Sequence, residues 1–435
     1  MQLTIHRGTK EIGGSCVEIE HRGSRIILDL GIPLVWGEGN RFDLKKFEHY
    51  SGKQLIEAKV LPNISGFYKW SASRSKVDGL LISHAHLDHY GFINHVRYDI
   101  FCYLGEGTKR IIDLTNLFLG GNCKISNFKY LRSGEAFDIG SFKITPYLMD
   151  HSAFDAYAFL IETGDKKLLY PGDFRDHGRK SKAFYWFLRA IPKNIDTILL
   201  EGSLFGREDD AQKTEEDIEK ETSSELKKSN SIVFCIVSGQ NIDRLVSFYK
   251  AALRAKRLFV IDVYTANVLE SLKDLAKLPY PSDNFKNMRV FYPFNLCNKL
   301  RREGKVELMT KFRKFRITKK EISENLDKVF MITRQSMLPD LSRISGIQEA
   351  TVIYSMWEGY LKDKSMERLL DFMKDEKMHM VNIHTSGHAA IDTLKKMINR
   401  ISPKSIIPIH TFYPERFKTL FNNVMILRDG EKVTI

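Results

Sequence analysis

Cysteine is scarce in this sequence, and the few cysteines show no grouping. Of the 435 residues, five are cysteine, and none belongs to a Cys-x-x-Cys pair, which argues against a disulfide framework and a thiolate zinc site. Long apolar runs are also lacking: no stretch reaches the length that a transmembrane helix requires. Residues 1–7 are too polar for a secretory signal. We therefore expect a cytoplasmic protein.

Acidic residues are outnumbered by basic ones. There are 54 Asp and Glu against 67 Lys and Arg, a formal net charge of +13. This excess favours a polyanionic partner, such as nucleic acid or an anionic membrane surface, without choosing between them. With 43% apolar and 11% aromatic residues, intrinsic disorder is excluded as the main state. The length is comfortable for two domains.

The first two hundred residues have the pattern of short strands separated by Gly and charged turns, with a helix expected at 91–98. We expect strands at 16–20, 25–30, 77–83, 142–148, 156–163, 167–170 and 197–200. Sheet packed with helices is typical of an α/β or α+β sandwich.

After Glu201 strands and helices alternate, which predicts a parallel-sheet domain extending to about residue 375. Its first elements are expected at 231–237, 241–256, 258–263 and 266–275. From there the chain returns to two strands, at 380–383 and 405–409, separated by a helix at 389–401.

The densest group of metal-ligating side chains directly follows an apolar strand. Three histidines and one aspartate fall within six positions: His84, His86, Asp88 and His89. In an extended His-x-His both imidazoles lie on one side, and Asp88 with His89 can turn toward a second ion. This donor set suits Zn²⁺ or a neighbouring first-row metal rather than Ca²⁺ or Mg²⁺. The alternative is a polar loop with coincidental histidines, which chance disfavours.

One cluster cannot fill two metal sites, so further ligands are expected at other strand ends. His151, Asp173 and His410 each follow or end an apolar strand, Asp173 through a Gly turn. Taken singly, each is better explained as a capping or surface residue. Taken together with the histidine cluster, their repeated position at strand ends favours a shared metal centre.

The series His-x-His-x-Asp-His at 84–89, then His151, then Gly172-Asp173, resembles the metallo-β-lactamase superfamily. The rest of the chain resembles its β-CASP branch, the nucleases that include ribonuclease J and the endonuclease of mRNA 3′-end processing. Glu201, His388 and His410 match the three motifs of that branch, in the expected order.

The resemblance implies an α/β fold with two parts. A metallo-β-lactamase αββα sandwich would occupy residues 1–204 and 376–435. An inserted α/β cap, the β-CASP domain, would occupy residues 205–375.

The resemblance also implies two zinc ions, with Mn²⁺ as the alternative metal. Two such ions lower the pKa of a shared water and clamp the oxygens of an in-line displacement at phosphorus. The implied ligands are His84, His86 and His151 for one ion, and Asp88, His89 and His410 for the other, with Asp173 bridging. Asp88 thereby becomes essential for catalysis.

Three further residues are candidates for supporting roles. Asp29, at the end of an apolar strand, is expected to orient a ligand, and Glu201 to orient His388 or His410. His388 is the candidate general acid for the leaving oxygen, because a histidine can carry the proton near neutral pH. The alternative for His388 is a local cap at a helix start.

Two helix starts are candidates for substrate binding. Ser386 and Gly387 precede the helix expected at 389–401, and backbone N–H groups at a helix start suit a phosphate. Ser238 and Asn241 lie in a segment similar to the phosphate-contacting turn of the β-CASP cap. Ordinary helix capping is the alternative at both places.

A basic segment from Lys299 to Lys320 carries ten Lys and Arg side chains, with Phe312 and Phe315 between them. Cations that follow a backbone and rings that stack on bases would suit single-stranded nucleic acid. The alternative is a solvated face, with both rings in the core of the cap.

Together these features predict a dinuclear-zinc phosphodiesterase that cleaves single-stranded RNA, or DNA, by attack of a metal-activated hydroxide on phosphorus. The expected partner is single-stranded nucleic acid, RNA favoured, rather than a membrane, and a homo-oligomer is compatible with the sequence. A hydrolase of small esters or thioesters is the alternative, since one fold hosts many reactions. A non-catalytic RNA-binding relative is a weaker alternative, because no metal ligand is missing.

Overall fold

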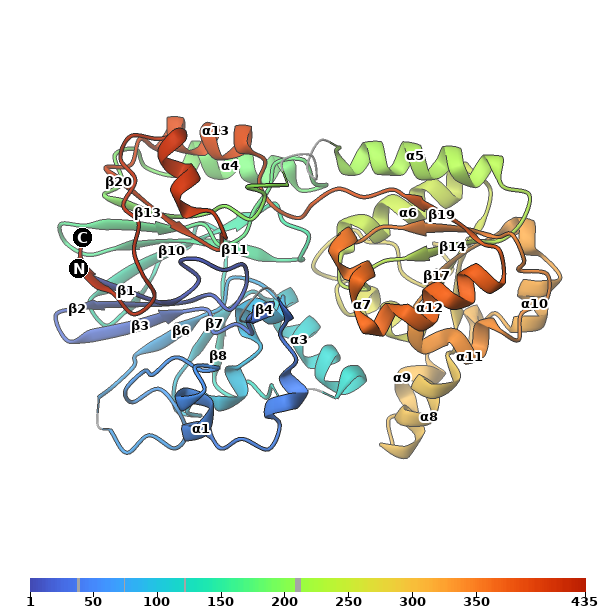
Figure 1. Cartoon of the computed structure of the whole chain (residues 1–435), viewed down its shortest axis with the longest axis horizontal. Helices are drawn as coiled ribbons and strands as arrows, with labels where there is room; N and C mark the ends of the chain where they lie inside the picture. The colour runs from blue at the N-terminus through green and yellow to red at the C-terminus, as the bar shows by residue number, and fades with distance from the viewer. Residues whose placement is uncertain (37–39, 74, 121–122, 208–212) are drawn as a thin grey trace. The chain divides into compact units, whose positions relative to one another are not determined.

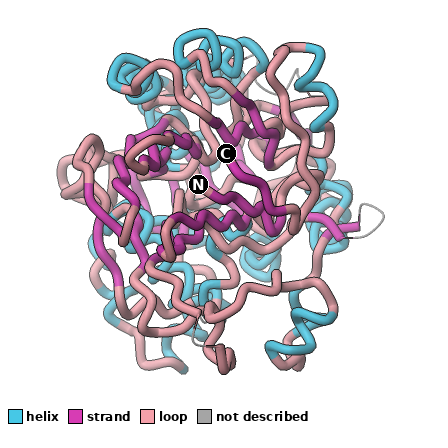
Figure 2. Tube along the Cα trace, turned by 90° about the vertical axis from the view of Figure 1, so that its left-hand side faces the viewer, coloured by secondary structure: helices cyan, strands magenta, loops and turns pink. Residues whose placement is uncertain are grey.

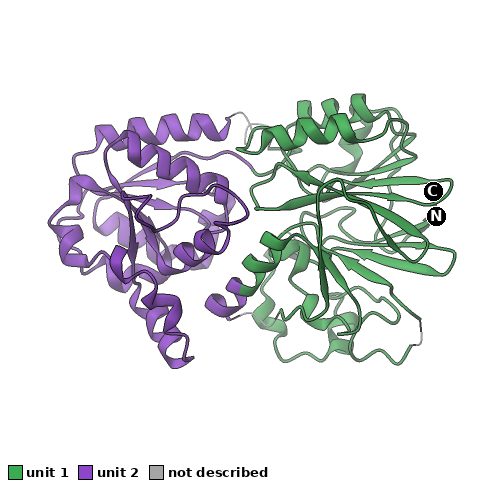
Figure 3. Ribbon diagram, turned by 180° about the vertical axis from the view of Figure 1, so that it is seen from behind, with its two compact units in different colours: residues 1–113, 121–211, 387–435 green, residues 114–120, 212–386 purple. Residues whose placement is uncertain are grey.

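The chain divides into two units, which Figure 3 shows in different colours. The computed structural model describes residues 1–36, 40–73, 75–120, 123–207 and 213–435. Unit 1 comprises Met1–Asp113, Gly121–Ala211 and Gly387–Ile435, and unit 2 comprises Leu114–Gly120 and Gln212–Ser386.

The first sheet of unit 1 has seven strands in the order β21-β1-β2-β3-β6-β7-β8. Their bounds are β1 Gln2–Arg7, β2 Cys16–His21, β3 Ser24–Leu28, β6 Gly79–Leu81, β7 Cys102–Leu104, β8 Phe128–Tyr130 and β21 Lys432–Thr434. Strands β2 and β3 form a hairpin joined by Arg22 and Gly23, both of which have positive φ. That geometry matches the twist of a two-residue hairpin turn. Because β21 pairs with β1, the two termini lie side by side (Figures 1 and 2).

The second sheet of unit 1 has six strands in the order β20-β13-β12-β11-β10-β9. Their bounds are β9 Phe137–Ile139, β10 Phe142–Met149, β11 Ala156–Glu162, β12 Lys167–Tyr170, β13 Thr197–Glu201 and β20 Ser405–Ile409. Strand β20, which follows unit 2 in the chain, pairs in parallel with β13 and places Ile409 opposite Glu201. A late segment of the chain thereby reaches the same sheet edge as Glu201.

The two sheets of unit 1 pack face to face, with helices outside. One apolar cluster joins residues of both sheets, among them Ile5, Val17, Phe159 and Leu199. A second cluster packs helices α4 (Ser181–Ala190) and α13 (Ile391–Ile401) on the other face of the second sheet. Three α-helices lie between the strands of the first sheet in sequence: α1 Gly52–Glu57, α2 Leu87–Tyr90 and α3 Glu106–Leu119. This layering confirms the expected sandwich.

Unit 2 contains one parallel sheet with the order β16-β15-β17-β14-β18-β19. Its strands are β14 Val233–Ile236, β15 Leu258–Asp262, β16 Met288–Phe291, β17 Val329–Thr333, β18 Thr351–Tyr354 and β19 His379–Asn382. Its α-helices are α5 Glu215–Lys228, α6 Ile242–Arg254, α7 Val263–Ser271, α8 Phe294–Arg302, α9 Glu307–Thr310, α10 Lys319–Ser323, α11 Leu338–Leu341 and α12 Lys364–Asp375. The expected alternation of strand and helix is confirmed here.

The strand expected at 380–383 is present as β19, and it pairs with β18 in the sheet of unit 2. The helix expected at 91–98 is wrong: α2 ends at Tyr90, and a 3-10 turn, Ile93–His95, follows. The chain leaves the helix there because the Phe92 N–H donates to the Leu30 carbonyl at 3.1 Å. The domain boundaries at 204/205 and 375/376 stay a prediction.

No helix in the described parts of the chain combines the length and the apolar character needed to cross a bilayer.

Candidate metal centre

Three imidazoles of unit 1 converge on one point. His84 and His86 come from the loop after β6, and His151 from the loop after β10. His86 Nδ1 lies 3.1 Å from His84 Nε2 and 3.2 Å from His151 Nε2. Burial, followed by the neighbouring histidines, holds the pKa of His84 and of His151 well below the ordinary value. Burial likewise lowers the pKa of His86 to about 4, so all three are neutral, the form that binds a metal.

A second group of donors has a different character, with carboxylates among the imidazoles. Ligand atoms of Asp88, His89, Asp173 and His410 lie within 4.8 Å of one another. His89 Nε2 is 3.0 Å from Asp173 Oδ2, and His410 Nε2 is 3.3 Å from Asp88 Oδ2. Both aspartates are buried. Unlike the first group, this set contains two carboxylates, whose negative charge favours a positive charge nearby.

The electrostatics of the second group are compatible with a cation at its centre. Burial would raise the pKa of Asp173, but His410, His89 and His388 outweigh it and hold that pKa well below the ordinary value. Burial lowers the pKa of His89, and the carboxylates around it outweigh this and raise it. Among the described residues, only histidines form ion pairs with Asp88 and Asp173. Buried carboxylates without Lys or Arg fit a metal ion.

Four of the five histidines in these groups share one arrangement: Nδ1 is engaged and Nε2 faces a neighbouring donor. The Nδ1 partners are Ser83 Oγ for His84 at 3.0 Å, Asp29 Oδ2 for His89 at 2.8 Å, the Gly387 carbonyl for His151 at 2.7 Å and Ser203 Oγ for His410 at 2.8 Å. A partner that accepts from Nδ1–H leaves Nε2 without a proton, ready for a metal. The donor chemistry therefore fits metal ions in both groups.

Asp29 forms several of the hydrogen bonds that hold these histidines in place. Its carboxylate accepts hydrogen bonds from the Ser83 N–H at 2.7 Å, the Ser83 hydroxyl at 2.8 Å and the Tyr170 hydroxyl at 2.7 Å. Because the Ser83 hydroxyl has a single proton, its oxygen remains to accept from His84. Asp29 thus orients His89 directly and His84 through Ser83. Neither Ser83 nor Tyr170 was among the residues predicted from the sequence.

A third group surrounds His388. The Glu201 carboxylate lies 3.2 Å from His388 Nδ1 and accepts from the Ser203 hydroxyl at 2.6 Å. Burial lowers the pKa of His388, but Glu201 and Asp173 outweigh it and raise that pKa above the ordinary value. His388 therefore holds its proton more strongly than an isolated imidazole does. Ser203 joins Glu201 to His410, a link that the sequence shows only as a hydroxyl two residues after Glu201.

Two site residues have backbone conformations that side chains rarely adopt. Asp29 has φ of 59° and His410 has φ of 53°. Both follow a strand directly, and the left-handed turn costs a non-glycine residue about 1–2 kcal/mol. Such conformations concentrate at functional sites, where the surrounding structure enforces them.

The structure gives other contacts to most of the predicted substrate residues. Helix α13 begins at Ile391, so Ser386 and Gly387 do not stand at its N-terminus. Gly387 packs so closely that a Cβ there would come within 2.4 Å of Ser152 Oγ. In unit 2, Asn241 caps α6 through the Arg244 N–H. The Ser238 hydroxyl accepts from the Gln240 N–H at 3.3 Å. Their substrate roles stay predictions.

Comparison with known proteins agrees with this geometry. Residues 375–418, which include His388 and His410, match the family model described as "Zn-dependent metallo-hydrolase RNA specificity domain". Ribonuclease J of Helicobacter pylori is 22% identical over all of this chain. Transcription termination factor FttA of Methanothermobacter thermautotrophicus is 23% identical over 93% of it.

These matches are consistent with the β-CASP branch of the metallo-β-lactamase superfamily. The chain covers 61% of the ribonuclease J and 65% of FttA, so it spans less than two thirds of those relatives. A solved structure of a protein of unknown function from Enterococcus faecalis has the same fold, with a TM-score of 0.79 and 22% identity. The match covers all of this chain and 99% of that protein.

Proposed function

We propose that the chain is a zinc-dependent phosphodiesterase that cleaves single-stranded RNA. The observation that carries the proposal is His388, held by Glu201 and set beside Asp173, which belongs to both the second and third donor groups. A proton donor next to a metal-ligating carboxylate is what cleavage of a phosphodiester with an alkoxide leaving group requires.

The residues that would hold the ions follow from the three donor groups. One zinc would bind His84, His86 and His151, a second would bind Asp88, His89 and His410, and Asp173 would serve both. When bound, the two ions supply an activated water and compensate the negative charge that develops on the phosphate. The imidazoles are prepared for this binding, because Ser83, Asp29, the Gly387 carbonyl and Ser203 engage the Nδ1 atoms of His84, His89, His151 and His410.

The remaining steps belong to the chain's own residues. Glu201 accepts from His388 Nδ1–H, which leaves Nε2–H as the proton to be donated to the leaving oxygen. Asp173 adds a second negative charge 3.8 Å from His388 Nδ1 and helps to keep the ring protonated. The product would carry a 5′-phosphate.

RNA is favoured over DNA by two observations. The description of the matched family model contains the words "RNA specificity domain", and the relatives include proteins named Ribonuclease J. The net charge of +13 suits any polynucleotide and does not discriminate between the two.

The test is cleavage of end-labelled single-stranded RNA and of DNA with the matching sequence, with zinc or manganese added. We expect RNA cleavage by the wild type and its loss in His388→Ala. The matched control is His379→Ala, at an exposed position on β19, which should keep wild-type activity. If neither polymer is cut by a protein that holds metal, the nuclease proposal fails and small esters are the next substrates to test.

A further inference from the structure

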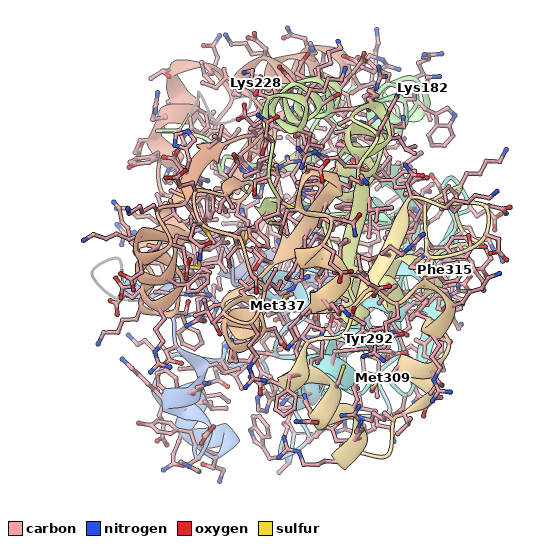
Figure 4. The ribbon with its side chains drawn as sticks, turned by 90° about the vertical axis from the view of Figure 1, so that its right-hand side faces the viewer. Lys182, Lys228, Tyr292, Met309, Phe315 and Met337 are labelled. Atoms are coloured by element: carbon pink, nitrogen blue, oxygen red, sulfur yellow. The ribbon has the colours of Figure 1, made fainter. Side chains whose placement is uncertain are left out.

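The basic segment from Lys299 to Lys320 accounts for much of the charge of the chain. It carries ten basic and two acidic side chains, in a chain of net charge +13. In unit 2 it runs from α8 through α9 and a 3-10 turn, Arg313–Phe315, into α10, and so links β16 to β17. Figure 4 labels Tyr292, Met309 and Phe315 in this region, on the face turned to the viewer.

The lysines of this segment are neutralised locally. Each of the six has a carboxylate within 4.0 Å: Glu303 for Lys299 and Lys305, Glu270 for Lys311, Asp283 for Lys314, Asp340 for Lys319 and Glu324 for Lys320. Their positive charge is therefore largely compensated within unit 2.

The four arginines differ from the lysines in this respect. Arg301, Arg302, Arg313 and Arg316 are all exposed, and none forms an ion pair with a carboxylate among the residues that the structure describes. Arg301 donates to the Asn298 side chain at 3.0 Å, and Arg316 lies 5.8 Å from the centre of the Tyr292 ring. The uncompensated charge of the segment is thus arginine charge, and guanidinium groups bind phosphate in a bidentate way.

Helix α8 arranges two of these arginines with other nucleotide-binding groups. Residues 294, 298 and 301 follow the i, i+4, i+7 spacing of one helix face, beside the buried Cys297 and Leu300. The Phe294 ring at the start of this face is 54% exposed. A hollow of about 560 Å³ is lined by Asn295, Asn298, Arg301 and Arg302. Amide and guanidinium donors with an exposed ring suit a base and its phosphate.

The aromatic part of the sequence prediction needs a correction. Phe312 is only 2% exposed, because it packs inward, and Phe315 is half-buried beside the Lys314 ammonium. Neither ring is free to stack as expected. Phe294, outside the predicted segment, is an exposed ring in this region.

Helix stability alone does not explain the four arginines. A cation in the last turn of α8 interacts favourably with the helix dipole, by about 0.3–1 kcal/mol. Arg313 lies in a 3-10 turn of three residues, which is too short for such an effect.

We propose that this arginine surface, formed by Phe294, Asn295, Asn298, Arg301, Arg302, Arg313 and Arg316, binds the backbone of single-stranded RNA. The inference rests on the proposed function for the choice of RNA. The contact would hold a long substrate on unit 2, outside the metal centre of unit 1.

The test compares two variants that lose the same charge from the same segment. The four-arginine variant changes to Gln the residues Arg301, Arg302, Arg313 and Arg316. The four-lysine variant changes to Gln the residues Lys305, Lys311, Lys314 and Lys320. Fluorescence anisotropy measures binding of a labelled oligouridylate across a salt series, with a chelator present to prevent cleavage. Thermal unfolding verifies that both variants are folded.

We expect the four-arginine variant to bind the oligouridylate about tenfold or more weakly near physiological salt. The slope of its log affinity against log salt concentration should be shallower by about 2–3 units, because each lost contact to single-stranded nucleic acid removes about 0.7 from the slope. The four-lysine variant should stay within about threefold of the wild type, because its lysines are already paired. Equal losses in the two variants, or no loss in the first, would overturn the proposal.

Two further results separate this surface from its alternatives. If the wild type binds phosphatidylserine vesicles, and the four-arginine variant loses only that binding, the surface is a membrane contact and the proposal is wrong. If the arginines are needed for RNA binding but the metal-loaded chain cuts no RNA, the surface stands and the proposed function fails. Cleavage together with unaffected binding in the variant overturns the surface alone.

Discussion

The ion pair between Arg244 and Glu215 should be the most sensitive point in the stability of unit 2. Both side chains are buried, at 0% and 1% exposed, and Arg244 Nη2 lies 3.0 Å from Glu215 Oε1. Arg244 also donates to the Ser355 hydroxyl and, at 3.0 Å, to the Thr385 carbonyl. Replacing Arg244 by Met leaves the Glu215 carboxylate buried without a cation, which costs about 3–5 kcal/mol.

The assay should measure the stability of unit 2 separately from that of unit 1. The reactivity of a buried cysteine in each unit makes this possible. Cys235 lies on β14 in unit 2 and Cys16 on β2 in unit 1; both are free and buried. The rate at which each reacts with a thiol reagent, read by mass spectrometry, measures how often its surroundings open. Since every 1.4 kcal/mol is tenfold, Arg244→Met should raise the reactivity of Cys235 by about 100- to 4,000-fold. Cys16 should react as in the wild type.

A matched control lies on α5. Lys220 pairs with Glu216 at 3.2 Å, and their side chains are 63% and 70% exposed, so Lys220→Met should cost less than about 1 kcal/mol. Replacing both Arg244 and Glu215 by Met should recover most of the stability, because the buried charge is then gone. Unchanged Cys235 reactivity in Arg244→Met, or an equal effect from Lys220→Met, would refute the reasoning.

Further predictions concern the metal centre. Glu201→Gln removes the charge that raises the pKa of His388, so the alkaline limb of the pH–rate profile should move to lower pH by about 1–3 units; Glu135→Gln, at an exposed position, should leave it in place. The shift is to lower pH because His388 loses its proton as the pH rises through its pKa, and the variant lowers that pKa. Asp88→Ala should abolish hydrolysis and reduce bound zinc from about two ions per chain to about one, as measured by elemental analysis; full activity would contradict the ligand assignment. Asp29→Asn should weaken zinc binding by about 10- to 100-fold in a chelator competition, and unchanged affinity would show that Asp29 does not orient His89.

The sequence predicts the part of the site that consists of characteristic metal-ligating residue types. Histidine and aspartate at strand ends are rare enough to stand out, and the structure brings His84, His151, Asp173 and His410 into adjacent donor groups. The substrate roles given to the helix starts stay untested. The roles of individual ligands likewise stay predictions until a metal is measured.

The supports of the site could not be found in this way. Ser83, Tyr170 and Ser203 are ordinary residue types in the sequence, and only the fold sets their hydroxyl groups against Asp29 and Glu201. The sequence predicts a phosphate contact at Gly387 and gives no sign that its carbonyl accepts from His151 at 2.7 Å. Contacts between distant segments decide such roles, and local spacing does not encode them.

The same limit explains the errors in secondary structure. Apolar spacing favours a helix after Gly91, but the Phe92 N–H is taken by the Leu30 carbonyl of another segment. The short strand at residues 379–382 has no pattern that tells which sheet it joins. Its partner, β18, is selected by topology.

The pairing of β20 with β13 has a consequence for synthesis on the ribosome. Strand β13 ends at Glu201, and its neighbour begins at Ser405, about 200 residues later, or roughly 10–40 s at ordinary elongation rates. During that interval the edge of β13 has no partner, and an unpaired strand edge invites aggregation. His410 directly follows β20, so the second ligand group is incomplete for the same interval. The nascent chain consequently cannot form its full set of zinc ligands before all of unit 2 has been made.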